Sequence, residues 1–293
     1  MQESVNRFAA AYKDFALTIS IKKTEVLHQP APGVAHAANT SITIDGQPLT
    51  NCKKFVYLGS TLSSAVNVDE EVSRRLARAN AAFGRLSTNV WNRKGLSLST
   101  KIKVYRAVIL PTLLYASETW TVYSRHLKLL NSFHLRCLRH LIGVKWQDRV
   151  SNTEVLKRAD LTSVHQLIDH SQLRWAGHVM RMGDERLPKQ IFYIELFYGK
   201  RNKGGQRKRY RDSLKANLKR SYIDTADWED LAHDRSTWRS IKAETKNAEH
   251  SRNLHRDELR RKRTERASKS LSDANDLACE VCGRKCKARI GLI

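Results

Sequence analysis

Apolar and polar positions divide the chain at about residue 66. Before that point, apolar side chains in residues 3–15 recur every three or four positions, which predicts an amphipathic helix. Alternating or β-branched runs predict short strands. These are 17–21, 24–27, 41–44 with the turn Asp45-Gly46 after it, and 55–61. The first part of the chain is therefore expected to combine one helix with a few short strands.

Beyond residue 66 the apolar residues recur with helical spacing, and no alternating run predicts a strand. The stripe from Val72 to Val90 follows Asn67 and Asp69, either of which can cap a helix. Pro111 predicts a kink or break in the next helix, and Ser151 has capping-box spacing to Glu154. The further helices expected are 99–113, 124–142, 151–158, 164–179, 210–218 and 227–246. The pattern predicts an α+β fold, a small piece with short antiparallel strands followed by a mainly α-helical region.

Positive charge is concentrated after residue 70. The 293 residues carry 53 Lys and Arg against 29 Asp and Glu, a formal net charge of +24. Residues 1–50 hold four basic and four acidic side chains, whereas 71–150 hold 15 against 3, or +12. Residues 199–220 hold 10 against 1, or +9. Such a surface favours a polyanionic partner and strongly salt-dependent binding, although Lys and Arg also simply solvate helix faces.

The composition excludes several classes of protein: membrane-spanning proteins, secreted proteins and disulfide-rich scaffolds. No run of about 18 apolar residues predicts a membrane span, and the N-terminus lacks the pattern of a secretory signal. Three of the five cysteines lie in the last fifteen residues, unlike a secreted disulfide scaffold. We therefore expect an intracellular, soluble, basic protein with a polyanion as its partner, no membrane partner and no small-molecule substrate of its own.

Five motifs recur in a fixed order. They are Phe-Ala-Leu-Thr-Ile at 15–19 leading into Lys-Lys-Thr at 22–24, the run 55–60, the runs 103–106, 110–115 and 118–120, the run 173–182, and the run 203–207. Together they resemble the end of the palm, the primer grip, the thumb and the C-terminal region of non-LTR (LINE-like) retrotransposon reverse transcriptases. The resemblance covers about residues 1–245.

The resemblance implies a division of the chain into five parts. Residues 1–66 would be the last piece of the palm with the primer-grip strand, 67–150 the thumb, and 151–246 a basic helical C-terminal region. Residues 247–275 are expected to form a charged helix or a disordered linker, and 276–293 a truncated zinc-finger-like segment.

The resemblance also shows what this chain lacks. Polymerases of this family join nucleotides with Mg²⁺ ions held by an aspartate pair, which in the family lies immediately before the helix at residues 3–15. No Asp-Asp dipeptide occurs in the sequence. We therefore expect the C-terminal part of an RNA-directed DNA polymerase that binds an RNA/DNA primer–template, neither holds Mg²⁺ nor polymerises alone, and comes from a truncated element or an incomplete gene.

Several site residues follow from the resemblance. Lys23 would approach the triphosphate and could protonate the leaving pyrophosphate as a general acid, or it is simply a solvated lysine. Tyr57, Leu58 and Gly59 would form the primer grip. Ala16 replaces the family's usual glycine and, at a helix end with positive φ, would be strained by about 1 kcal/mol.

Basic side chains are the candidates for phosphate contacts, which position a duplex without reading its sequence. In the thumb and the basic loop they are Arg74, Arg75, Arg78, Arg85, Lys101, Lys103, Arg106, Lys200, Arg201, Lys203, Arg207, Lys208 and Arg209.

The C-terminal cysteines are a separate candidate site. Cys279 and Cys282 have the spacing of half a zinc knuckle, and Cys286 is either a third ligand or an apolar position of the finger. Three sulfurs need an outside fourth ligand to bind Zn²⁺, so reactive free cysteines are the alternative. Cys52 and Cys137 are expected to be core thiols, and no metal site is expected at His165, His170 or His178.

Two alternatives to a polymerase fragment stay open. One is a non-catalytic basic nucleic-acid-binding protein that needs neither Lys23 nor the primer-grip turn. The other is a degenerate retroelement relic. The resemblance implies a full-length protein that works on nuclear DNA and carries RNA from the cytoplasm, so we expect it in the nucleus and cytoplasm. A basic run at 260–263 could serve in nuclear import, although such short runs are frequent by chance.

Overall fold

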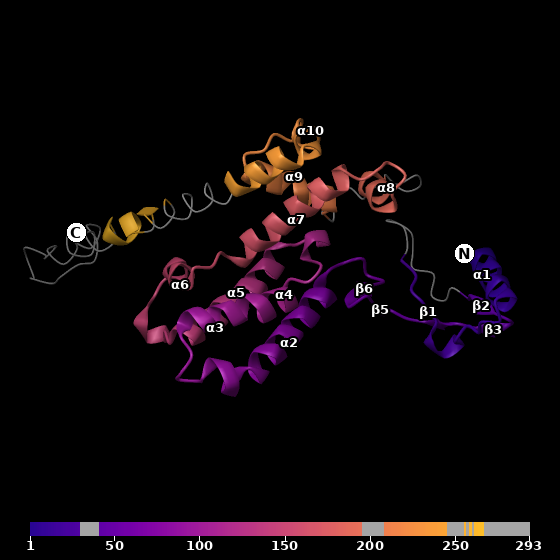
Figure 1. The fold of residues 1–293 in the computed structure, drawn as a ribbon, viewed down its shortest axis with the longest axis horizontal. Helices are drawn as coiled ribbons and strands as arrows, with labels where there is room; N and C mark the ends of the chain where they lie inside the picture. The colour runs from indigo at the N-terminus through magenta and orange to yellow at the C-terminus, as the bar shows by residue number, and fades with distance from the viewer. Residues whose placement is uncertain (30–40, 195–207, 245–254, 256–257, 260, 267–293) are drawn as a thin grey trace, which may run out of the picture. The chain divides into compact units, whose positions relative to one another are not determined.

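The computed structural model describes residues 1–29, 41–194, 208–244, 255, 258–259 and 261–266. It divides into two compact units, Met1–Trp238 and Arg239–Ile293. Figure 1 traces the chain from the N-terminal helix through short strands into a series of helices. The fold is α+β and mainly helical, as the sequence predicts. No described helix is both long and apolar enough to cross a membrane.

The N-terminal part is built from one helix and short strand pairs. Its elements are α1 (Gln2–Asp14), a 3-10 turn (Ile21–Lys23), β1 (Glu25–Val26), β2 (Thr43–Ile44), β3 (Gln47–Pro48) and β4 (Thr50–Asn51). Strand β1 pairs in parallel with β4, and β2 forms an antiparallel hairpin with β3. Ile42, Ile44 and Leu49 form a small core, against which Val5 and Ile19 pack. The other face of α1 stays exposed.

The expected Asp45-Gly46 turn is confirmed. Both residues have positive φ, 49° and 78°, as the two-residue turn between β2 and β3 requires. The strand expected within 17–27 is confirmed only at β1, because no strand pairs with residues 17–20 and a 3-10 turn begins at Ile21. Ile19 and Ile21 do face the small core, so the alternation marks burial without a strand.

The helical part begins at α2, and one core cluster extends from α2 to the first turns of α7. The helices are α2 (Asp69–Arg85), α3 (Leu98–Val104), α4 (Leu110–Leu113), α5 (Ser124–Ile142), α6 (Asn152–Arg158), α7 (Val164–Met180), α8 (Leu187–Tyr193), α9 (Tyr210–Arg220) and α10 (Trp228–His233). Leu113, Leu130, Leu138 and Ile168 are fully buried at its centre. Helix α7 contacts α5, α8, α9 and α10.

Helix starts and the proline break follow the sequence closely. Helix α5 has the expected bounds, and the Ser151 hydroxyl accepts a hydrogen bond from the Glu154 N–H at the start of α6. The cap of α3 is Ser97, two residues before the expected start of this helix at 99. Pro111 cannot donate a backbone hydrogen bond, and the predicted irregularity is a π-helical turn, Tyr105–Ile109, just before α4.

Gly177 explains part of the motif at 173–182. A Cβ at this position would overlap the ring of Trp238, whose Nε1 donates to the Leu173 carbonyl at 3.0 Å. Trp238 is 1% exposed. The absence of a side chain at position 177 therefore allows the Trp238 ring to pack directly against the backbone of α7.

Candidate nucleic-acid interface

A tight hairpin carries the three residues predicted to form the primer grip. Strands β5 (Lys54–Tyr57) and β6 (Ser60–Ser63) are antiparallel, with Tyr57 opposite Ser60. The two turn residues are Leu58, with φ 47°, and Gly59, with φ 83°. Positive φ at both positions defines the turn type that matches strand twist, and leucine rarely adopts it. The strand predicted over 55–61 ends at Tyr57, and the strand and turn expected at 57–59 are present, with β6 following the turn.

A buried ion pair on α2 holds this turn. The Arg75 Nε donates to Glu71 Oε1 at 2.6 Å, and both side chains are only 4% exposed. Arg75 Nη2 donates to the Gly59 carbonyl at 2.6 Å. Glu71 Oε2 accepts the Thr61 N–H at 2.6 Å, and Oε1 accepts the Ser60 hydroxyl at 3.4 Å. The pair thus fixes both sides of the turn.

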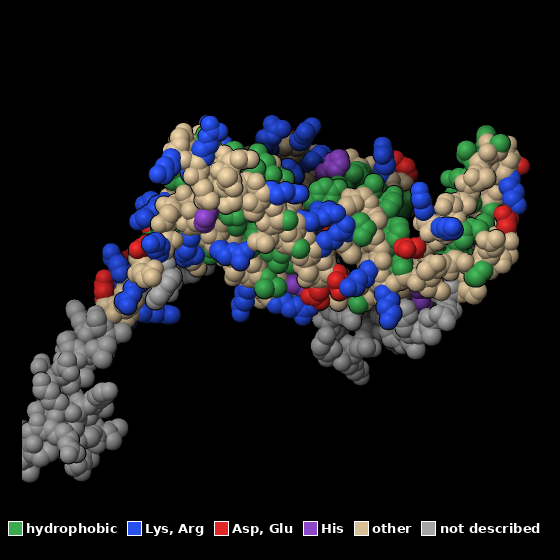
Figure 2. All heavy atoms as spheres, turned by 90° about the horizontal axis from the view of Figure 1, so that it is seen from below, with side chains coloured by type: hydrophobic (Ala, Val, Ile, Leu, Met, Phe, Trp, Pro, Cys, Tyr) green, Lys and Arg blue, Asp and Glu red, His purple; other side chains and the backbone are tan. Residues whose placement is uncertain are grey.

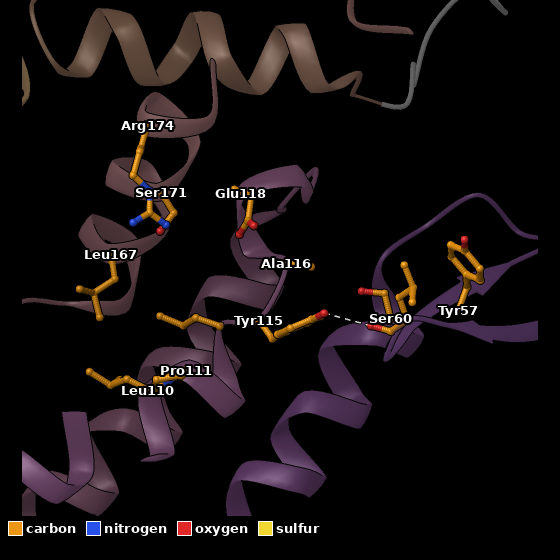
Figure 3. Close-up of a pocket in the computed structure, with 12 residues that line it drawn as sticks. Tyr57, Ser60, Leu110, Pro111, Tyr115, Ala116, Glu118, Leu167, Ser171 and Arg174 are labelled. Carbon is orange, nitrogen blue, oxygen red and sulfur yellow. Dashed lines mark hydrogen bonds between the residues drawn. The ribbon is translucent and has the colours of Figure 1, made fainter. Parts of the chain in front are cut away.

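Tyr115 completes the attachment from the residues after α4. Its hydroxyl donates to the Leu58 carbonyl at 3.0 Å, the hydrogen bond drawn in Figure 3. The Arg75 guanidinium lies over the Tyr115 ring, 4.4 Å from the centroid. Three side chains from two segments therefore bind the backbone of the turn.

A groove runs beside the hairpin and has a volume of about 630 Å³. Figure 3 shows Tyr57 and Ser60 on one side, Leu110, Pro111 and Tyr115 in the middle, and Leu167, Ser171 and Arg174 of α7 on the other side. The remaining lining residues are Leu58, Leu114, Ala116 and Glu118. The groove therefore joins the hairpin turn to α7 across an apolar floor.

The groove presents stacking surface and one available cation. Tyr57 is 59% exposed and Leu58 75% exposed, so both side chains are accessible from solvent. Arg174 is exposed and has no acidic partner among the described residues. Aromatic faces stack with bases, and guanidinium groups bind phosphates.

The other predicted basic residues that the structure describes fall into two groups. Arg78, Arg85, Lys103, Lys208 and Arg209 are exposed, as is Arg106, which donates to the Asp160 carbonyl and carboxylate. Arg74 donates to Thr61 Oγ1 at 3.0 Å and Lys101 to the Trp91 carbonyl at 2.7 Å, and both are half-buried. Figure 2 shows Lys and Arg spread over one face, with few Asp and Glu. Lys200, Arg201, Lys203 and Arg207 lie outside the described residues.

Arg75 differs from these residues because it is buried. A phosphate could reach its guanidinium only if the bonds to Glu71 and Gly59 opened. Its observed contacts are those of an anchor for the hairpin.

Lys23 lies at the end of the 3-10 turn, exposed, and is not part of the groove lining. The structure describes no neighbouring group that would assist proton transfer from it. Its role as a general acid stays a prediction.

The cysteine and histidine predictions have mixed outcomes. Cys137 is 2% exposed, and burial raises the pKa of its thiol to about 12, as expected for a core residue. Cys52 is half-buried, and burial raises its pKa as well. No group of three or more His, Cys, Asp or Glu side chains in the described ranges could hold a metal ion. Cys279, Cys282 and Cys286 lie outside those ranges.

Three residues of this site have no predicted role from the sequence: Glu71, Tyr115 and Arg174. Tyr115 belongs to a thumb motif, but that motif assigns no function to its side chain. Glu71 and Arg75 do have the i, i+4 spacing of a helical ion pair. Arg174 lies within the motif at 173–182, which gave no role for its side chain.

Comparisons with known proteins agree with the resemblance. A transposon-derived protein of Caenorhabditis elegans is 26% identical over 242 residues, 78% of this chain and 83% of that protein. The RNA-directed DNA polymerases from the mobile element jockey of Drosophila funebris and Drosophila melanogaster are 25% and 22% identical over 114 residues. Each jockey match covers 39% of this chain but only 12% of the polymerase.

Neither a family model nor a solved structure matches the chain. The similarities that do exist all lead to mobile elements. These homologues, at low identity and partial coverage, support a fragment related to the reverse transcriptases of LINE-like, non-LTR retroelements, and the 114-residue match to the jockey polymerases is the part shared with a named polymerase.

Proposed function

We propose that the chain binds the recessed end of an RNA/DNA primer–template in the groove between the hairpin turn and α7. The observation that carries this proposal is the groove itself, which is lined by the predicted primer-grip residues Tyr57 and Leu58, by apolar side chains and by Arg174 of α7. The relationship to RNA-directed DNA polymerases of jockey elements supports the choice of ligand.

The chemistry of the groove divides the contacts by type. Tyr57 and Leu58 would pack against the terminal base and sugar, because both present apolar surface at the turn. Arg174 would bind a phosphate near the end of the primer, with a charge-assisted hydrogen bond. The exposed Arg78, Arg85 and Lys103 would contact duplex phosphates, which adds affinity without sequence preference.

Nucleotide transfer is not part of this proposal. In the polymerases that the chain resembles, an aspartate pair holds Mg²⁺, and this chain has no Asp-Asp dipeptide. Lys23 would act as a general acid only if an aspartate-bearing segment were supplied. Zn²⁺ binding by Cys279, Cys282 and Cys286 is a separate proposal and would need a fourth ligand from outside this set.

Fluorescence anisotropy across a salt series tests the proposal. A labelled recessed RNA/DNA hybrid should bind more tightly than a blunt hybrid or a single strand of equal length, with a steep negative slope against log salt. Tyr57→Ala should weaken recessed-end binding by about tenfold, because base–aromatic stacking contributes about 1–3 kcal/mol. Tyr12→Ala, at an exposed tyrosine of α1, should leave binding unchanged.

Equal affinity for every polyanion, insensitive to Tyr57, would contradict the proposal. The exposed basic residues on α2 and α3 would then account for binding by charge alone. That result would favour a non-catalytic basic protein or a retroelement relic.

A further inference from the structure

The ion pair between Glu71 and Arg75 is unusual in its placement. Both side chains are 4% exposed, although α2 also carries solvent-exposed basic residues such as Arg78. Removing two charges from water is unfavourable, so a buried pair of this kind is weak grounds for added stability. The hydrogen bonds that the pair makes outside α2 indicate a role in holding the hairpin.

All the bonds of the pair outside α2 go to the hairpin. Arg75 donates to the Gly59 carbonyl, and Glu71 accepts from the Thr61 N–H and the Ser60 hydroxyl. Tyr115, against whose ring Arg75 lies, donates to the Leu58 carbonyl. Four consecutive residues of the turn, 58–61, are thus bound by three side chains.

The turn has a conformation that its own sequence opposes. Leu58 has φ 47°, in the left-handed region where a side chain with a Cβ is disfavoured. Its side chain is 75% exposed, so packing does not hold it there. Besides the pairing of β5 with β6, the hydrogen bonds that Glu71 accepts and that Arg75 and Tyr115 donate are the contacts that hold the turn.

We infer that Glu71, Arg75 and Tyr115 are positioning residues that hold Tyr57 and Leu58 in place for the primer end. This inference rests on the proposed function of the groove. It assigns to Arg75 a role that differs from direct phosphate contact: the guanidinium acts through the turn, and the turn contacts the nucleic acid.

The first test is the double variant Glu71→Gln/Arg75→Met. It removes one negative and one positive charge, so net charge and the salt slope should not change, and it leaves no unpaired buried ion. Circular dichroism should match that of the parent. The ratio of recessed-end to blunt-hybrid affinity should fall by about tenfold, the effect of losing one or two hydrogen bonds that set the geometry.

The conservative variant Tyr115→Phe removes only the hydroxyl that binds Leu58 and keeps the ring under Arg75. It should lower the same ratio by about threefold without affecting blunt-hybrid binding. It also keeps the inference testable if the double variant fails to fold.

Leu58→Gly relieves the turn, because glycine adopts positive φ without penalty, but it also removes the Leu58 side chain from the groove, so its readout is hydrogen exchange rather than binding. The increase in amide exchange of residues 54–63 caused by Glu71→Gln/Arg75→Met should be smaller in a chain that already carries Leu58→Gly than in the parent. An equal effect in both backgrounds would mean that the three side chains do not act through the conformation of the turn.

Hydrogen exchange separates this inference from the proposed function, since it needs no nucleic acid. In the double variant, amides of residues 54–63 should exchange faster while those of α5 stay protected. Unchanged exchange in 54–63 would overturn the inference even if the parent prefers recessed ends. A parent with no end preference would overturn the proposed function, and the exchange data would still decide whether these side chains hold the turn.

Discussion

Ala16 ends α1 in the conformation that the sequence indicated for the family's glycine. Its φ is 53°, and the two hydrogen bonds of a Schellman motif follow it, from the Ala16 N–H to the Lys13 carbonyl and from the Leu17 N–H to the Tyr12 carbonyl. Alanine is disfavoured there because its Cβ crowds the backbone. The strain predicted from the sequence therefore has its structural basis.

Ala16→Gly should stabilise the end of α1 by up to about 1 kcal/mol. Hydrogen exchange of the α1 amides should slow accordingly. The matched control is Ala11→Gly in the interior of the same helix, which should destabilise it by about 1 kcal/mol. Changes of the same sign in both variants would be inconsistent with a left-handed residue at position 16.

His134 is a fully buried histidine without a charged partner. Its Nδ1 accepts from the Tyr105 hydroxyl at 2.9 Å, and its Nε2 donates to the Thr162 carbonyl at 3.1 Å, as expected for the neutral ring. Burial lowers its pKa to about 4 from an ordinary value of 6.5. Between these pH values the unfolded chain takes up a proton that the folded chain does not.

The helical part should therefore lose up to about 3 kcal/mol of stability as pH falls from 6.5 to 4, because each pKa unit corresponds to about 1.4 kcal/mol. Urea unfolding at pH 7 and pH 4.5 measures this loss. His134→Gln, which can keep both hydrogen bonds, should flatten the pH dependence, whereas His178→Gln at an exposed site should not. An identical pH dependence in all three chains would refute the assignment.

At the scale of elements, Arg174 tests whether α7 forms one side of the binding groove. Arg174→Gln should weaken recessed-hybrid binding by about tenfold, since a charge-assisted hydrogen bond contributes about 1.5–3 kcal/mol. Arg93→Gln removes the same charge from an exposed loop outside the groove and should have a much smaller effect. Equal losses in competition titrations would mean that Arg174 contributes only general charge.

Helix bounds and breaks that depend on capping residues, proline or hydrophobic period were predictable from local sequence. Helix α5 has the expected bounds, the Ser151 cap is confirmed, and Pro111 is preceded by the irregular turn that its missing N–H requires. In each case the deciding contact lies within four or five residues along the chain. Hydrophobic period and capping chemistry are sufficient there.

Features that depend on distant contacts were not predictable in this way. The alternation at 17–21 has no partner strand, so it forms no strand. The hairpin turn at Leu58 has positive φ at a leucine, a choice that local preference opposes and that Tyr115, 57 residues away, supports. The burial of Arg75 follows from the hairpin lying against α2, and the sequence shows only a basic residue.

At the scale of the whole molecule, two properties point to the same ligand. The chain carries a net charge of +24, and the described surface has exposed Lys and Arg on several helices. The groove adds a local site with aromatic, apolar and cationic side chains. In the proposed function, charge would supply salt-dependent affinity for any polyanion, and the groove would distinguish a recessed end.

Photocrosslinking from position 57 tests that distinction most directly. Benzoylphenylalanine in place of Tyr57, on the full chain with a recessed RNA/DNA hybrid, should crosslink to the 3′-terminal nucleotides of the primer. The same group in place of Tyr12 should give no crosslink at the end. Crosslinks from position 57 spread evenly along the duplex, or absent from the primer terminus, would contradict the central claim that the hairpin and α7 hold the primer end.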